Sequence, residues 1–423
     1  MKIYIDNSLV SKEAVKYIFE IFLKNKKIDF SFVKDTNADF IISNSSFSDM
    51  EISEDFFKSI NSGIYDFDNY FKDDCTIKTR NGSIDYLSTA FYMINCIQEY
   101  SKKDLDVYKR FKYAKSYQFH YKNIEVNLVQ ELFDKLMKSN RKLNQLSKPD
   151  TKTKFFLSHD IDTVYGALLQ DGFKALKQKK LNVIIKLFFN VLMQRPDWLN
   201  IDKIMNIENE YDFKSTFYWL VNKGKLNELE RNSDYSINDK KIRRSINFAQ
   251  ERNWENGLHK SISKQSFKEE ISKLRFKPLG NRYHYLKFLL PDAYKDIEDT
   301  DLKLDSSLGF ADVIGFRNSY GLPFHPYNFE NKEPYNFLEV PLNIMDQTFY
   351  GYEKLPPEQI GKKVISFFEK NNTNCVISVL WHNNFFSNYK FSGYLEAYKE
   401  ILGYLYESRY ECVNQEELLK SNY

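Results

Sequence analysis

Residues 155–163 read Phe-Phe-Leu-Ser-His-Asp-Ile-Asp-Thr, and the fold expected for the rest of the chain follows from them. Apolar residues that run into polar ones are typical of a short buried strand ending in functional side chains. Because side chains alternate along a strand, Asp160 and Asp162 face the same way while Ile161 packs behind them. Two neighbouring carboxylates need a cation or an arginine nearby to stay ionised. The stretch therefore favours a metal site, or a metal ligand beside a general base; two helix-capping aspartates are the alternative.

The composition indicates a chain that does not bind nucleic acid. The formal net charge is +3 over 423 residues, so there is no strong basic field to attract a polyanion. Aromatic residues make up 17% of the chain, which suits a sugar-handling protein but is weak evidence alone. The four cysteines are scattered without metal-binding spacing and fit buried thiols in a reducing compartment.

No segment has the pattern of a membrane span. The N-terminus, residues 1–6, resembles a strand and lacks the apolar run of a signal peptide. The most apolar segment, residues 183–193, is interrupted by Lys186 and Asn190 and is shorter than the ~20 residues a span needs. We expect this segment to be a buried or interfacial helix, and the protein to be cytoplasmic.

The order of expected elements predicts two domains. Residues 1–150 alternate short strands with amphipathic helices, which indicates a small α/β extension, and they contain no paired carboxylates or clustered histidines. Residues 144–154, with Pro149, are expected to form a linker. From residue 155 to the end, many strands alternate with helices, and residues 283–290 and 337–345 are two of the expected strands. That pattern predicts a parallel sheet, and its length favours a (β/α) barrel over residues 151–423.

Candidate chemical residues fall at or near the ends of the expected strands. In a (β/α) barrel the carboxyl ends of the strands converge on one site. A single histidine at a strand end is more often structural, but four of the six histidines recur there beside carboxylates. These residues are His159, Asp160, Asp162, His259, Arg282, His284, Asp305, Asp346 and His382.

The order of these motifs resembles the polysaccharide deacetylases, the metal-dependent carbohydrate esterases of family four with a distorted (β/α) barrel of the NodB-homology type. Their first motif is matched by residues 159–162, and their Leu-x-His motif by residues 380–382. The resemblance covers roughly residues 155–413. It is closest to a bacterial branch that reads Gly-Leu-His at 257–259, Arg-x-His at 282–284 and Gly-Phe-Arg at 315–317, often with an N-terminal α/β extension.

The resemblance implies roles for the matching residues. Asp160 is expected to be the catalytic base, with Arg282 holding it in place. Asp162 and His259 are expected to bind a divalent metal, most simply Zn²⁺. His382, oriented by Asp346, would protonate the leaving group.

The third metal ligand departs from the family pattern. The family has a second histidine four residues after His259, where this chain has Ser263. A neutral hydroxyl is a poor ligand for a divalent ion, so His284 is preferred, and water is the remaining option. Arg282 and His284 lie two residues apart, so both reach the site only if the strand end bends.

Three further residues are candidates for substrate contact. Arg317 could bind an anionic group of the substrate or, with equal weight, pair with a neighbouring carboxylate. The other two are His159, in the first motif, and Trp381, in the Leu-x-His motif.

The leading functional hypothesis is a metal-dependent hydrolase that removes acetyl from an N-acetylated sugar. The expected substrate is a nucleotide- or lipid-linked precursor of a surface polysaccharide, or an N-acetylated oligosaccharide. One alternative is a degenerate barrel that binds glycans or partners without turnover, suggested by the missing second-motif histidine. Another is a hydrolase of other amides, such as a cyclic ureide.

Overall fold

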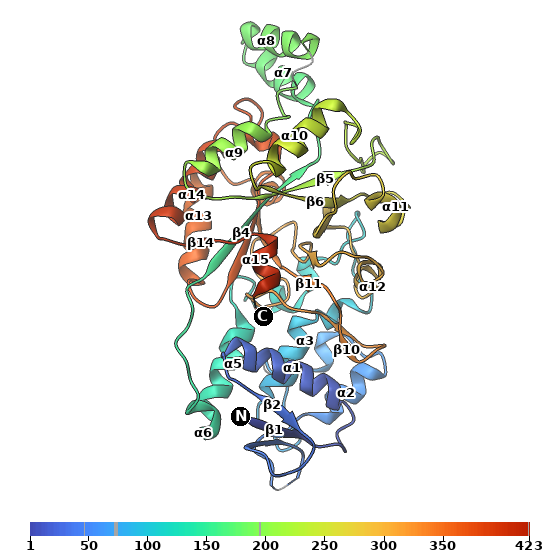
Figure 1. Ribbon diagram of the computed structural model, residues 1–423, viewed down its shortest axis with the longest axis vertical. Helices are drawn as coiled ribbons and strands as arrows, with labels where there is room; N and C mark the ends of the chain where they lie inside the picture. Colours follow the sequence, from blue (N-terminus) through green and yellow to red (C-terminus); the bar gives the residue numbers. More distant parts are fainter. Residues whose placement is uncertain (46, 72–74, 194–195, 422) are drawn as a thin grey trace.

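The computed structural model describes residues 1–45, 47–71, 75–193, 196–421 and 423 (Figure 1). Among these residues it contains a three-stranded, a two-stranded and a nine-stranded sheet. The small three-stranded sheet and the nine-stranded sheet lie at different levels of an elongated molecule (Figure 1). The mixed α/β fold expected from the sequence is confirmed.

The N-terminal segment is a small parallel sheet with helices packed against it. Strand β1 (Lys2–Ile5) lies between β2 (Ser31–Val33) and β3 (Phe40–Ile42). Helix α1 (Lys12–Asn25) is amphipathic and buries Ile18, Phe19 and Phe22 completely. The other helices are α2 (Glu54–Asn61), α3 (Tyr86–Ile94), α4 (Tyr117–His120), α5 (Leu128–Ser139) and α6 (Arg141–Asn144).

The nine-stranded sheet is parallel and curls towards a barrel. Its strand order is β11-β8-β7-β6-β5-β4-β13-β12, with β14 also pairing with β4. Among the described residues, no strand pair joins β11 to β12 at the two ends of this order, but the amide of Leu342 donates to Leu308 O at 3.0 Å. The strands are β4 (Lys154–Ile161), β5 (Thr216–Leu220), β6 (Glu255–Lys260), β7 (Gly280–Tyr283), β8 (Leu304–Asp305), β11 (Leu338–Glu339), β12 (Leu342–Met345), β13 (Val376–Leu380) and β14 (Glu411–Cys412).

Helices cover the outer face of this sheet. They are α9 (Ile201–Asn209), α10 (Lys240–Gln250), α11 (Phe267–Ile271), α12 (Asp292–Glu298), α13 (Pro357–Lys370) and α14 (Tyr394–Glu407). Helix α15 (Gln415–Lys420) instead packs through Leu418 against Phe156, which lies on the same face of β4 as Asp160. Helices α7 (Ala167–Lys177) and α8 (Leu181–Leu192) instead form a hairpin that projects from one end of the molecule (Figure 1). Among the described residues, we find no helix with the length and apolar character required to cross a bilayer.

Two expected strands differ from the structure for local reasons. The strand predicted over residues 283–290 ends at Tyr283, because Tyr285 and Leu286 adopt positive φ angles of 60° and 52° that turn the chain. The strand predicted over residues 337–345 is two strands, β11 and β12, interrupted at Pro341, which has no amide hydrogen to donate.

A buried ion pair joins the N-terminal segment to the large sheet. Arg317 donates to both carboxylate oxygens of Glu99, at 2.9 Å from Nε, and to Gly309 O at 2.9 Å. Both side chains of the pair are 2% exposed. Removing two charges from water is costly. The free energy of burying each charge is therefore offset only by its counter-charge and by these hydrogen bonds.

We therefore predict that Glu99→Gln is strongly destabilising, by about 3 kcal/mol, because it leaves the Arg317 guanidinium buried without its counter-charge. Urea unfolding followed by circular dichroism measures the change. The control is Asp55→Asn, which removes the partner of Arg80 in an exposed ion pair and should leave the unfolding midpoint nearly unchanged. Equal midpoints for the two variants would contradict the prediction.

Candidate active site

Strand β4 carries two carboxylates to the C-terminal edge of the sheet. Asp160 lies in β4 and Asp162 directly after it, while the alternate residues His159 and Ile161 face the helices on the other side. The neighbouring parallel strands run in the same direction, so their ends meet at this edge. This register brings the ends of β6, β7 and β13 close to Asp162.

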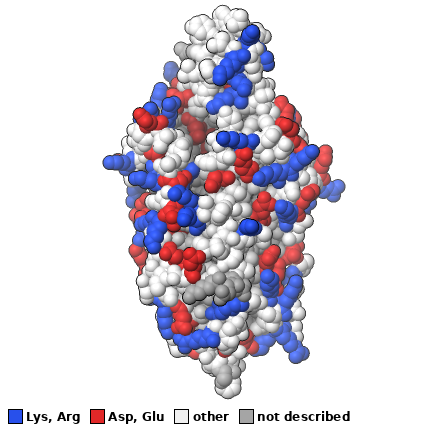
Figure 2. All heavy atoms as spheres, turned by 180° about the vertical axis from the view of Figure 1, so that it is seen from behind, with Lys and Arg blue, Asp and Glu red and all other residues white. Residues whose placement is uncertain are grey.

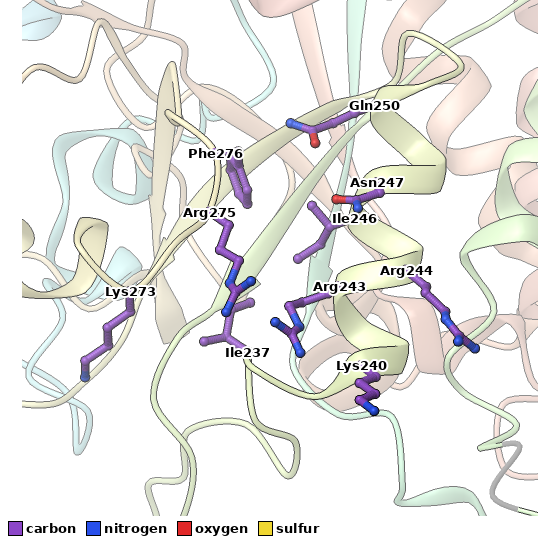
Figure 3. Close-up of a pocket in the computed structure, with 10 residues that line it drawn as sticks. All are labelled: Ile237, Lys240, Arg243, Arg244, Ile246, Asn247, Gln250, Lys273, Arg275 and Phe276. Atoms are coloured by element: carbon purple, nitrogen blue, oxygen red, sulfur yellow. The ribbon is translucent and has the colours of Figure 1, made fainter.

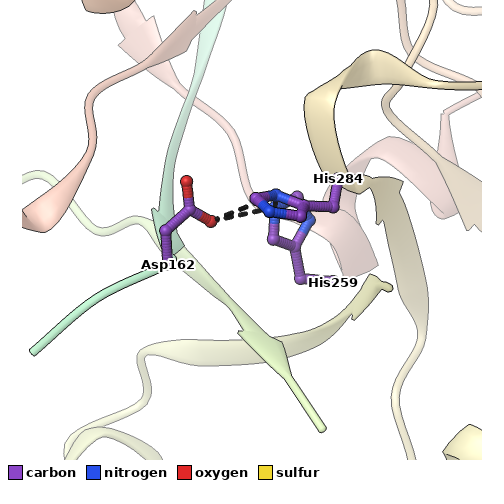
Figure 4. A group of neighbouring side chains, drawn as sticks. All are labelled: Asp162, His259 and His284. Carbon is purple, nitrogen blue, oxygen red and sulfur yellow. Dashed lines mark hydrogen bonds and ion pairs between the residues drawn. The ribbon is translucent and has the colours of Figure 1, made fainter. Parts of the chain in front are cut away.

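Three side chains from three strand ends meet in one cluster (Figure 4). His259 Nε2 lies 3.3 Å and His284 Nδ1 lies 3.4 Å from Asp162 Oδ1, and the two nitrogens are 3.1 Å apart. A tetrahedral ion with ligands at 2.0–2.1 Å places those ligands about 3.3 Å from one another. The three atoms therefore have the spacing of three ligands of a zinc-type ion.

The remaining hydrogen bonds of the two histidines indicate which nitrogens carry protons. His259 Nδ1 lies 2.8 Å from Arg282 O, and His284 Nε2 lies 2.8 Å from Arg231 O. A carbonyl oxygen only accepts, so both of these nitrogens donate. In the neutral imidazoles, the nitrogens facing Asp162 are then both lone-pair acceptors. Three acceptors meet without a donor, and a cation satisfies all three.

The electrostatics of the cluster agree with this arrangement. Burial raises the pKa of Asp162, but the three neighbouring histidines outweigh burial and lower it below its usual range. Burial lowers the pKa of His284 to about 4. The carboxylate is thus ionised and His284 neutral at physiological pH, as metal binding requires. Burial also lowers the pKa of His259, but Asp160 and Asp162 raise it overall, so a proton there competes with a metal ion.

Asp160 is held by a fully buried arginine. Arg282 Nη1 donates to Asp160 Oδ1 at 3.0 Å and to Ser158 Oγ at 2.8 Å. Its other nitrogens donate to Ser306 O at 2.8 Å and Ser306 Oγ at 2.7 Å. The guanidinium is therefore fixed on both sides, and a charge-assisted bond orients one oxygen of Asp160. The second oxygen, Oδ2, lies 3.5 Å from His259 Nε2.

His382 faces the cluster from the end of β13. Its Nδ1 donates to Asp346 Oδ1 at 2.7 Å, and its backbone amide donates to Asp346 Oδ2 at 2.6 Å. Its Nε2 lies 3.7 Å from Asp162 Oδ2. Burial lowers the pKa of His382, but Asp346 and then Asp162 outweigh burial and raise it to about 10. The imidazole is an oriented proton donor at neutral pH.

A pocket of about 220 Å³ opens onto these residues. One part of its wall is apolar and includes Leu286, Ala311, Met345 and Leu380. The other part contains aromatic and polar side chains, among them Tyr108, Arg110, Tyr285, Gln347, Tyr352, Asn384 and Phe385. The pocket thus combines an apolar recess with aromatic surfaces next to the acid–base groups.

Two of the pocket residues come from the N-terminal segment and were not predicted. Tyr108 stacks on Tyr285, with ring centroids 5.4 Å apart and an interplanar angle of 13°. Arg110 donates to Tyr285 O at 3.1 Å and to the Tyr352 hydroxyl at 2.9 Å. No sequence motif marks these contacts, since they join segments more than 170 residues apart. That residues 1–150 supply no catalytic group stays a prediction, although this segment lines the pocket.

The three predicted substrate contacts lie away from this pocket. His159, on the helix-facing side of β4, is bound to Trp381 O at 2.6 Å and Glu208 Oε1 at 2.7 Å. Trp381 is fully buried on the same side and packs on Tyr398. Arg317 forms an ion pair with Glu99, so of its two expected roles the structure has the pairing with a neighbouring carboxylate. Strand alternation explains the first two placements, because each residue is adjacent to one that faces the site.

Ser263 and His284 occupy different environments. Ser263 is bound through its hydroxyl to Asn222, Ser261 and Glu270, and it does not line the pocket that contains Asp162, His259 and His284. His284 reaches the cluster because β7 ends at Tyr283 and the chain turns immediately afterwards. The bend that the sequence requires for both Arg282 and His284 is therefore present.

Comparison with known families gives a match to the N-terminal part. Residues 1–145 match the model of a family of unknown function, DUF7033. No curated protein matches the chain.

Several solved structures resemble the chain at low sequence identity. A protein described as a polysaccharide deacetylase from Mycobacterium smegmatis is 12% identical, with a TM-score of 0.41, over 65% of this chain and 91% of that one. A CE4 family pseudoenzyme from Bacillus anthracis is 12% identical, with a TM-score of 0.33, over 64% and 67%. The peptidoglycan deacetylase PdaC from Bacillus subtilis is 10% identical, with a TM-score of 0.31, over 64% and 92%. At these values, only the geometry of the site carries an argument about chemistry.

The cluster predicts which substitution removes metal. His284→Ala should strip the metal from the purified protein, because it deletes one of the three converging ligand atoms. Ser263→Ala is the matched control and should retain its metal, because the Ser263 hydroxyl donates to Glu270 and not to the cluster. Elemental analysis by mass spectrometry after dialysis measures both. Full occupancy in His284→Ala would exclude His284 as a ligand.

Proposed function

We propose that this protein is a metal-dependent hydrolase that removes the N-acetyl group from a sugar. The observation that carries the proposal is the three-ligand cluster with an acid–base pair beside it. Asp160, held by Arg282, lies next to His259, and His382, held by Asp346, lies next to Asp162. Amide hydrolysis needs one group that takes a proton and another that gives one, close to an electrophilic centre.

A divalent cation held by Asp162, His259 and His284 would polarise the amide carbonyl and lower the pKa of a nearby water. The protein's own residues manage the protons. Asp160 accepts the proton of the attacking water through its Oδ2 atom, which Arg282 leaves free. Arg282 keeps that carboxylate ionised and fixed in direction, since the guanidinium is bound to Ser158 and Ser306 as well.

The second proton transfer belongs to His382. As the C–N bond breaks, its Nε2 proton passes to the leaving nitrogen, and the products are acetate and a free amine. Asp346 holds the imidazole by its Nδ1 atom and its backbone amide, so Nε2 is the atom left facing the substrate. Asp346 also stabilises the imidazolium before transfer, which agrees with the raised pKa of about 10.

The pocket supports an N-acetylated sugar as the substrate. The recess of Leu286, Met345 and Leu380 suits a methyl group, and the tyrosines suit the apolar face of a pyranose ring. We propose that the sugar belongs to a nucleotide- or lipid-linked precursor of a surface polysaccharide, and that the ion is zinc.

The acid–base assignment predicts separable losses. Asp160→Asn should keep its metal but lose turnover by about 10²–10⁴-fold, because it removes the general base. Asp162→Asn is the matched variant two residues away and should lose metal as well as activity. Metal content and acetate release are measured on the same preparations. Near wild-type turnover in metal-loaded Asp160→Asn would show that the base is another group.

The reaction itself is tested with a panel of small amides. We expect acetate release from N-acetylated amino sugars and no ring opening of cyclic ureides, because the apolar recess and aromatic wall suit the former. The metal-loaded enzyme is compared with Asp160→Asn on each compound. Ring opening without acetate release would replace the proposal by a cyclic amidase, and no turnover of any compound by metal-loaded protein would favour a binding function.

A further inference from the structure

The α7–α8 hairpin exposes far more apolar surface than its own packing requires. The two helices contact each other through small or buried residues: Gly172, Ala175, Val183 and Leu187 are buried. A Cβ at Gly172 would lie 3.9 Å from Leu187, so the helices meet closely there. The packing of the two helices against each other therefore leaves their outward apolar residues uncovered.

These outward residues form one stripe on each helix. The stripe on α7 has i, i+4, i+7 spacing, and the stripe on α8 has i, i+4, i+7, i+11 spacing, so each lies on one helix face. All are more than half exposed, from 52% at Phe188 to 78% at Leu169. The stripes consist of Leu169, Phe173 and Leu176 on α7, and Leu181, Ile185, Phe188 and Leu192 on α8. Apolar patches of this kind mark interaction sites.

The charges around the stripes have one sign. Residues 166–193 contain five exposed lysines and a single acidic residue, Asp171, which is buried. Within the residues that the structure describes, none of these lysines forms a salt bridge, and only Lys186 has an acidic neighbour, Asp197, which lies beyond the end of α8. The five are Lys174, Lys177, Lys179, Lys180 and Lys186. At this end of the molecule, Figure 2 shows white and blue atoms side by side. An apolar stripe bordered by lysines is the pattern of helices that lie on anionic lipid.

A second group of cations adjoins the base of the hairpin. The Tyr165 hydroxyl donates to Asp239 at 3.2 Å, which places the start of α10 beside the start of α7. Residues of α10 line a pocket of about 280 Å³ together with residues that follow α11. Arg243 extends into it from α10, and Arg275 from the segment after α11 (Figure 3). In the described part of the chain, neither arginine is ion-paired with a carboxylate. A second group of cations without a carboxylate partner thus lies on the barrel next to the base of the hairpin, beyond Asp239.

The hairpin is fixed to the loop that carries His382. Buried Asp171 accepts from Trp198 Nε1 at 3.0 Å, Ser387 Oγ at 2.7 Å and the Lys390 amide at 3.0 Å. Gly166 is needed at the first turn, because a Cβ there would lie 2.5 Å from the Trp198 ring. The hairpin is therefore a rigid extension of the active-site rim.

We propose that the α7–α8 hairpin docks the protein on the surface of a bilayer that contains anionic lipid. The two apolar stripes enter the boundary between headgroups and acyl chains, and the lysines lie among the phosphates. Helix α8 has 12 residues, about 18 Å, which is too short to span the ~30 Å hydrocarbon core. A second copy is a poor occupant, since a two-fold contact would oppose two sets of unpaired lysines.

Docking has a consequence for the substrate that rests on the proposed function. Helix α7 begins shortly after Asp162, so a docked hairpin holds the pocket close to the headgroup layer. A sugar carried on a lipid is presented at that level, whereas a free nucleotide sugar is not. Docking itself is independent of catalysis and is tested without any activity measurement.

The test is sedimentation of the full-length protein with vesicles of phosphatidylcholine, with and without phosphatidylglycerol. We expect binding to the anionic vesicles that weakens with salt. The apolar triple variant Phe173→Gln, Ile185→Gln, Phe188→Gln should bind at least ~10²-fold less. The charge triple variant Lys174→Gln, Lys177→Gln, Lys180→Gln should lose about five-fold per lysine and on the order of 10²-fold in all.

Matched controls alter the same kinds of residue elsewhere on the surface. Phe119→Gln, Leu146→Gln, Tyr406→Gln is the apolar control, and Lys135→Gln, Lys138→Gln, Lys362→Gln is the charge control; all these residues are exposed. Both should bind like the wild type. The proposal is overturned if the wild type ignores anionic vesicles, if neutral vesicles bind it equally, or if the controls lose as much. A dimer that forms through the hairpin, without vesicle binding, would also overturn it and assign the surface to a second copy.

Discussion

The active-site end of the structure depends on the meeting of three electron-pair donors within 3.4 Å of one another. Asp162 Oδ1 and the inward nitrogens of His259 and His284 repel each other unless a cation lies among them. The backbone fixes this arrangement, since the carbonyls of Arg282 and Arg231 each bind the outer nitrogen of one imidazole. Asp160 and His382 lie beside this cluster, because Asp160 is in β4, which leads into Asp162, and His382 follows the neighbouring strand β13.

The parallel sheet brings the residues of the active site together. Residues from β4, β6, β7, β12 and β13 reach one point only because these strands run in the same direction and end at one edge. Arg282 shows how much of the interior serves the site: its guanidinium is fully buried, stacks over Tyr218 at 4.7 Å and bonds to Ser158, Asp160 and Ser306. Such a buried cation is tolerated where each of its donors has a partner.

Much of this site could be predicted from the sequence because its residues follow strand ends. Asp160, Asp162 and His259 follow from that rule, and His284 from the poor ligand chemistry of Ser263. The same rule of alternation would have excluded His159 and Trp381, which are adjacent to inward-facing residues. Tyr108, Arg110 and the pairing of Arg317 with Glu99 could not be predicted, since each depends on contacts between distant segments. The division of the chain near residue 150 stays a prediction.

The α7–α8 hairpin is joined to the active site by the chain itself and by hydrogen bonds. The chain runs from Asp162 through Thr163 into α7, and Asn383, next to His382, donates to the carbonyls of Thr163 and Trp198 at 2.8 and 2.6 Å. These contacts fix the hairpin relative to the two loops that carry Asp162, an expected metal ligand, and His382, the expected proton donor. A rigid attachment of this kind orients the pocket relative to whatever surface the hairpin contacts, and orientation reduces the entropy lost when substrate and catalytic groups come together. A surface bound by the exposed apolar stripes would therefore also determine which way the active-site pocket faces.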